Sequence, residues 1–209
     1  MKTLIKSTAL AIAGIVSFSF TSLDDKDPKV VIIDIVDNIE TTNNQNLTDS
    51  FKKSIDSINQ TEEVKVLDWK QITSGLDENK KQVLLDSIKP DVVLTLNFKN
   101  SEKGNNAVTA VVFKGNKHFE HSLTSAKELT SSFNEAVIKN EGVFQADSEY
   151  VQDNATPALF VSIETKNDSS SNKEIVSTLS DFIKKVDSDQ ANSNQENKSE
   201  IIQKDIKVE

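Results

Sequence analysis

The chain contains no cysteine, and this absence excludes several kinds of structure. Without thiols it can form no disulfide bond, hold no thiolate-bound metal and carry no lipid on a cysteine side chain. A domain that lacks such covalent staples must depend on its hydrophobic core for stability. We therefore expect one domain of ordinary size with a continuous apolar interior.

Arginine is also absent, because all 24 basic residues are lysine; there are 33 acidic residues, and the formal net charge is -9. The guanidinium fork that reads guanine edges and binds phosphates in a bidentate manner is therefore missing. An acidic chain is also poorly suited to anionic membrane surfaces, which attract clustered basic residues. We expect no nucleic-acid partner and no electrostatic binding to membranes.

Glycine is scarce, with five residues in the whole chain, and none belongs to a glycine-rich loop of the kind that cradles phosphates before a helix. No serine lies in the Gly-x-Ser-x-Gly turn that exposes a hydrolase nucleophile. Ser162 instead lies inside an apolar stretch, where we expect a core hydroxyl that bonds to the backbone. Neither a nucleotide-binding loop nor a serine-hydrolase motif is present.

Residues 1–22 have the anatomy of a signal peptide. Lys2 and Lys6 precede an apolar run at residues 9–16, and small residues follow it. The run is well short of the roughly 20 residues that a membrane-spanning helix needs, and no later segment is apolar enough to span a bilayer. We expect cleavage within residues 19–22 and a periplasmic or secreted mature chain with no membrane span. The alternative is an uncleaved N-terminal anchor.

Composition divides the remaining chain into three parts. Residues 23–28 form a charged spacer, residues 29–186 form the expected domain, and residues 187–209 form a tail rich in Asn, Gln, Ser and Asp. Such a tail cannot bury enough apolar surface to fold, so we expect disorder there. Its four large apolar residues predict either a frayed end, which we favour, or a short docking segment: Ile201, Ile202, Ile206 and Val208.

Apolar runs alternate with helical patterns inside the expected domain. Runs rich in β-branched residues predict strands at 30–36, 64–67, 91–97, 107–113 and 157–163. Apolar residues at helical spacing predict helices at 47–58, 77–88, 123–138 and 175–183. This order predicts a single α/β domain with a mixed, mostly parallel sheet and helices on both faces. The short turn at 104–106 further predicts that the strands on either side of it are neighbours.

Three strings of residues occur in an order that is typical of one enzyme family. Residues 30–34 form an apolar strand ending in aspartate, residues 89–97 read Lys-Pro-Asp-Val-Val-Leu-Thr-Leu-Asn, and Gly142-Val143 precedes Tyr150-Val151 and the Pro-Ala-Leu-Phe-Val of residues 157–161. In this order they resemble the catalytic domain of the zinc N-acetylmuramoyl-L-alanine amidases, which cut the amide between muramic acid and the stem peptide of bacterial cell walls. The resemblance implies the amidase-like fold.

The resemblance does not extend to the residues that the family's chemistry requires. A catalytic zinc needs three protein ligands and an open position, and a carboxylate takes the proton of the bound water. Asp37, Asn44 and Asn97 match the three zinc ligands of the family, and Ser162 matches its catalytic glutamate. The resemblance therefore implies an exported pseudoenzyme, without zinc or another cofactor, that binds peptidoglycan or a cell-envelope protein. The alternative is an active amidase or other cell-wall hydrolase with an unrecognised site.

Two other sets of residues could bind a metal. A zinc site could be rebuilt from Asp37 with Glu40 or Glu164, although solvated loop carboxylates are the favoured interpretation. His118 and His121 are three residues apart, a spacing that places two ligands on one helix face. They follow a turn-like segment and lack the four-residue spacing of the zincins, so we expect at most a weak surface metal pair.

Trp69 and Tyr150 are the only tryptophan and tyrosine in the chain. Either ring could stack on a sugar, because an aromatic face suits the C–H surface of a pyranose. Single aromatic residues more often pack against other side chains, and that is the interpretation we favour.

Overall fold

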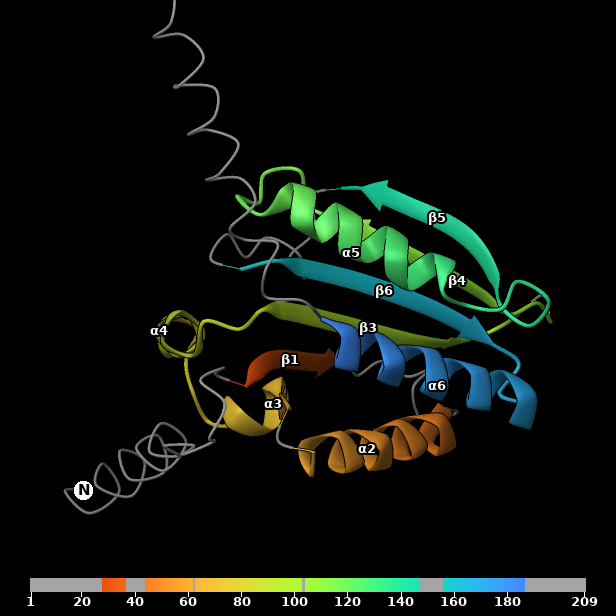
Figure 1. Cartoon of the computed structure of the whole chain (residues 1–209), viewed down its shortest axis with the longest axis horizontal. Coiled ribbons are helices and arrows are strands. Elements are labelled where there is room, and N and C mark those ends of the chain that lie inside the picture. The colour runs from red at the N-terminus through yellow and green to blue at the C-terminus, as the bar shows by residue number, and fades with distance from the viewer. Residues whose placement is uncertain (1–27, 37–43, 62, 103, 147–155, 187–209) are drawn as a thin grey trace, which may run out of the picture.

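The computed structural model describes residues 28–36, 44–61, 63–102, 104–146 and 156–186. These residues form one six-stranded sheet with helices packed against it (Figure 1). The predicted signal peptide, the spacer up to residue 27 and the polar tail lie outside the described residues. Within the described part of the chain, no helix combines the length and the apolar character needed to cross a bilayer.

The elements confirm the α/β prediction. In chain order they are β1 (Lys29–Ile35), α2 (Gln45–Asn59), β2 (Val64–Asp68), α3 (Trp69–Ile72), α4 (Glu78–Ile88), β3 (Val92–Asn100), β4 (Ala107–Val112), α5 (Phe119–Ser131), β5 (Lys139–Gln145), β6 (Ala158–Thr165) and α6 (Ser169–Lys185). Each predicted strand and helix is present. The helix predicted at 123–138 begins earlier and ends at Ser131, and β5 was not predicted.

The strands follow the order β2-β1-β3-β6-β4-β5. Only the pair β4–β6 is antiparallel, so the sheet is mixed and mostly parallel as predicted. The prediction that β3 and β4 are neighbours is wrong, because β6 lies between them. The apolar β6 pairs with β3 along its whole length and with β4 on its other edge. If β3 and β4 paired directly as a hairpin, β6 could no longer pair with both of them, and one edge of this apolar strand would lack a partner.

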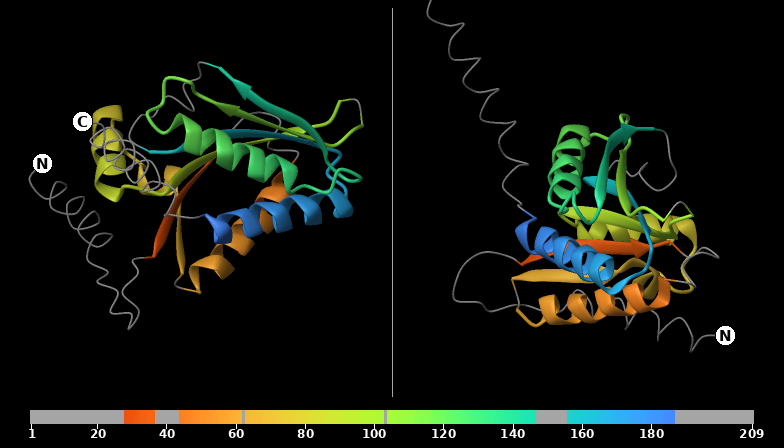
Figure 2. Two further views of the ribbon diagram at one scale, coloured as in Figure 1. Left: turned by 45° about the horizontal axis from the view of Figure 1, so that its top comes forward. Right: turned by 90° about the vertical axis from the view of Figure 1, so that its right-hand side faces the viewer.

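Three helices, α2, α5 and α6, pack against one face of the sheet, which we call the core face (Figure 2). Alternate strand residues such as Ile33, Leu96 and Val161 point into this layer and are almost fully buried. The rings of Phe51 from α2 and Phe98 from β3 meet edge to face, with centroids 6.3 Å apart. This layer is the hydrophobic core that a chain without disulfides requires.

The opposite face, which we call the second face, is covered in part by α4, so helices lie on both faces as predicted. The helix α4 lies apart from the other three long helices, beside the start of β3 (Figure 1). Its side chains line a cavity together with Val30 and Leu67, which are second-face residues of β1 and β2. Asp77 caps the start of α4, and Lys89 ends it in a left-handed conformation just before Pro90.

The outer edge of β2 is capped by a side chain. The amide of Asn59 donates to the carbonyl of Val66 at 3.1 Å and accepts from the N–H of Val66 at 2.7 Å. Asn59 therefore occupies the backbone groups that a further strand would use. Such capping protects an edge strand against pairing with another chain.

Candidate functional site

A row of polar residues crosses three neighbouring strands on the second face. Asn97 of β3 is the register partner of Ser162 of β6, and Ser162 is also the partner of Thr109 of β4. Register partners point to the same side of a sheet, so the three side chains form one row. The structure thus brings together two of the positions singled out in the sequence, Asn97 and Ser162.

The polar row becomes more exposed from β3 toward β4. Asn97 is 8% exposed, whereas Ser162 and Thr109 are only half-buried. The expectation that Ser162 is a core hydroxyl is therefore wrong, because the core positions of β6 are those on either side of it, Val161 and Ile163. The side chain of Ser162 lies on the second face and is partly open to solvent.

The neighbouring rows on the second face add charged groups to this surface. Lys99 and Glu164 are register partners one row further along β3 and β6, and Glu164 is exposed. On the other side of the row, Asp34 of β1 pairs with the buried Thr95. The centre of the second face is therefore polar, unlike the core face of the same strands.

Asn44 lies at the N-cap position of α2, where its side chain makes no capping hydrogen bond. The residue is fully buried, and among the described residues neither its amide oxygen nor its amide nitrogen has a hydrogen-bond partner. The hydroxyl of Thr48, one turn later, is also buried without a partner. An unpaired buried polar group costs about 1 to 3 kcal/mol, so we expect the amide of Asn44 to lower the stability of the fold.

Asp37, Glu40 and Tyr150 lie outside the described residues, so their predicted roles stay predictions. The chain leaves β1 at Val36, whose N–H donates to the carbonyl of Leu96 at 2.8 Å, directly before Asn97.

His118 and His121 lie at the start of α5, and both are half-buried. Burial lowers the pKa of His121 below its usual 6.5, and the nearby His118 adds to this effect. Since α5 packs on the core face, the sheet separates this pair from the polar row. Among the residues that the structure describes, no group of three or more histidine, aspartate or glutamate side chains could hold a metal ion.

Trp69 is the first residue of the short helix α3 and is half-buried. Trp69 therefore lies beside β1 and β2, because α3 contacts these two strands.

Sequence reasoning did not identify Thr109 as part of the polar row. The alternation of buried and half-buried residues along β4 is the signal that could have found it.

Comparison with known proteins bears on the fold. No protein-family model matches the chain, and no curated protein matches it. Solved structures do. The amidase AmiC2 of Nostoc punctiforme has 10% sequence identity and a TM-score of 0.54, and the match covers 74% of this chain and 94% of that one. The catalytic domain of the amidase CwlV from Bacillus (Paenibacillus) polymyxa var. colistinus has 13% identity, coverage of 74% and 96%, and a TM-score of 0.55.

An N-acetylmuramoyl-L-alanine amidase from Clostridium difficile 630 matches at 14% identity with a TM-score of 0.53, and the match covers 81% of this chain and 98% of that one. Such low identities carry information about the fold alone. This chain therefore has the fold of the N-acetylmuramoyl-L-alanine amidase catalytic domains.

Proposed function

We propose that this chain is an exported, non-catalytic amidase-like domain that binds peptidoglycan. The observation that carries the proposal is the pairing of Asn97 with Ser162 on adjacent strands. By the resemblance, these positions match a zinc-binding histidine and the catalytic glutamate of the amidases, and Asn97 and Ser162 are register partners on adjacent strands. Their adjacency supports the proposal that a site lies here in which the metal-binding and proton-accepting groups have been replaced.

The donor groups at these positions do not fit a catalytic zinc ion. Zinc in hydrolases is held by imidazole, carboxylate or thiolate groups. Asn44 and Asn97 are neutral amides, and Ser162 supplies a hydroxyl that remains protonated at neutral pH. A carboxylate base at the position of Ser162 would be worth roughly 10²- to 10⁴-fold in rate, and a hydroxyl does not replace it.

The same groups suit a neutral polar ligand. Hydroxyl and amide side chains donate and accept hydrogen bonds, as do the sugar hydroxyls, acetamido groups and peptide amides of peptidoglycan. Ser162 and Thr109 are partly exposed, so a ligand could reach them from solvent. Lys99 and Glu164 lie together in the next row, where they could pair with the charged ends of a stem peptide.

Co-sedimentation of the mature chain, residues 23–209, with purified sacculi tests this proposal. We expect the wild-type protein in the pellet, and we expect Ser162→Leu to weaken capture at least about tenfold, since each lost hydrogen bond to a ligand costs on the order of 1 kcal/mol and the larger side chain obstructs the row. Ser131→Leu, on the exposed end of α5, is the matched control and should bind as the wild type does. Wild-type protein that stays in the supernatant with excess sacculi would contradict the proposal.

A further inference from the structure

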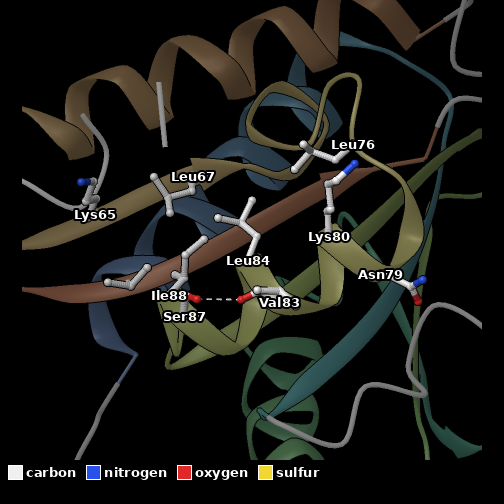
Figure 3. A pocket seen from close by; sticks show the side chains of 10 residues that line it. Lys65, Leu67, Leu76, Asn79, Lys80, Val83, Leu84, Ser87 and Ile88 are labelled. Atoms are coloured by element: carbon white, nitrogen blue, oxygen red, sulfur yellow. Dashed lines mark hydrogen bonds between the residues drawn. The ribbon is translucent and has the colours of Figure 1, made fainter. Parts of the chain in front are cut away.

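An apolar groove lies between α4 and the second face of β1 and β2 (Figure 3). Its volume is about 470 Å³. Six apolar side chains from the two strands, α4 and the turn before α4 line it: Val30, Leu67, Leu76, Val83, Leu84 and Ile88. In the close view these side chains converge on the space between the helix and the strands.

The helical pattern of the sequence predicts that Val83 is packed, but the structure shows this residue exposed beside the groove. The helical pattern of 77–88 groups Val83 with Leu84, Leu85 and Ile88 on one packed side. In the structure Leu84 and Leu85 are buried, but Val83 is 65% exposed. Only one other large apolar side chain among the described residues, Phe144, is exposed to a comparable degree. Exposed apolar side chains beside an apolar groove are typical of a docking surface.

The capped edge of β2 limits what can occupy the groove. Because Asn59 already bonds both outer backbone groups of Val66, an extended peptide cannot add to β2 as a regular strand. A short amphipathic helix that inserts apolar side chains between α4 and the strands is compatible with this capped edge.

We propose that residues 201–208 of this same chain occupy the groove. This inference is independent of the function proposed above. The apolar residues of the segment recur at helical spacing, with Ile202 and Ile206 four apart and Ile201 and Val208 seven apart. No other part of residues 187–209 carries apolar side chains in such number, and the preceding fourteen residues have the composition of a polar linker.

The last turn of α6 lies on the core face, at the same end of the sheet as the groove, so the linker has to pass around the sheet to reach the second face. Phe182 and Val186 share a cavity with His121, and the neighbouring Ser122 accepts a hydrogen bond from the first residue of β6, Ala158. The start of β6 pairs with the start of β3, and there the N–H of Asp91 donates to the carbonyl of Val30, a groove residue. The end of α6 and the groove thus lie at the same end of the sheet, where β3 and β6 begin, but on opposite faces.

The linker of residues 187–200 is long enough for this connection. A flexible chain of fourteen residues spans about 20 Å on average and at most about 46 to 50 Å when extended.

Hydrogen exchange on the mature chain, residues 23–209, tests the proposal through the amides of residues 200–209. We expect them to exchange at least about tenfold more slowly than in a free peptide of the same sequence. Val83→Asp should abolish this protection, because it places a carboxylate in the groove, while the exposed position spares the fold. Phe144→Asp, at the other exposed apolar residue, is the matched control and should leave the protection intact.

A second variant probes the same contact from the other side. Ile202→Asp with Ile206→Asp should speed amide exchange in α4, and Ser188→Asp with Ser193→Asp in the linker should not. Exchange of the C-terminal segment at the rate of a free peptide would overturn the proposal. Protection of residues 200–209 that survives Val83→Asp would also overturn it. So would protection that disappears when a dimer dissociates on dilution, because the groove would then be occupied by a second copy of the chain.

Discussion

The two faces of the central strands differ in composition, although they are made by alternate residues of the same segments. On the core face, Leu94, Leu96, Leu159 and Val161 are fully buried among three helices. On the second face, the intervening positions of β3 and β6 carry Thr95, Asn97, Ser162 and Glu164. The core face provides stability, whereas the second face carries hydrogen-bonding and charged side chains, several of them open to solvent.

The largest expected difference between the faces comes from two aspartate substitutions in β6. Val161→Asp should unfold the domain, because an unpaired buried charge costs several kcal/mol against a total stability of about 5 to 15 kcal/mol. Ser162→Asp, one residue later on the half-buried second face, should leave a folded protein. Circular dichroism during thermal unfolding measures both. Equal loss of structure in the two variants would show that the second face is as closely packed as the core face.

Two phenylalanine substitutions sharpen the same comparison. Phe51 is fully buried on the core face and packs against Phe98, so Phe51→Ala should lower the free energy of unfolding by about 3 to 5 kcal/mol. Phe144 of β5 is 53% exposed, and Phe144→Ala should change it by less than about 1 kcal/mol. Denaturant titration gives both values. A loss of several kcal/mol for Phe144→Ala would mean that the exposed face of β5 is packed against another part of the protein.

Replacement of Asn44 is expected to stabilise the protein, unlike the substitutions above. Because both polar atoms of its buried amide lack partners, Asn44→Leu should raise the free energy of unfolding by about 1 to 2 kcal/mol. Denaturant titration detects this gain, and Asn59→Leu serves as the contrasting variant. Asn59 makes two hydrogen bonds to Val66, so its replacement should destabilise the protein. A loss of stability in Asn44→Leu would show that the amide has a structural partner.

The smallest expected effect concerns pH. Burial first, and then the neighbouring His118, lower the pKa of His121 in the folded protein below 6.5, while Asp91 and Glu128 act in the opposite sense. Below pH 6.5 the unfolded chain takes up a proton that the folded protein resists, so this residue makes the fold less stable as the pH falls. His121→Gln should therefore lose less stability than the wild type between about pH 7.5 and 5.5. Thermal midpoints across this range provide the measurement, and parallel curves would contradict the expectation.

The sequence predicted much of the fold because the strands β1, β2, β3, β4 and β6 are marked by dense apolar runs. It did not predict β5, since Lys139–Gln145 has only two large apolar residues and lies at the edge of the sheet. The prediction that β3 and β4 are adjacent was also wrong. The turn between them contains no information on β6, which comes later in the chain and inserts between the two strands.

The polar row was predictable only in part. Asn97 and Ser162 were identified through the resemblance to the amidases, and their pairing then followed from the sheet. Thr109 and the groove beside Val83 depend on register and on how α4 is rotated about its axis. Hydrophobic periodicity does not fix either of these, since the pattern of α4 is compatible with burial of Val83.

Metal analysis combined with peptidoglycan digestion tests the central claim of a non-catalytic domain most directly. After dialysis, a protein of residues 23–209 should contain far less than one zinc per molecule, and chromatography of treated muropeptides should show no released stem peptide. Without zinc, nothing lowers the pKa of water toward neutrality, so too little hydroxide is available at neutral pH to attack an amide. One zinc per chain together with released stem peptide would contradict the account.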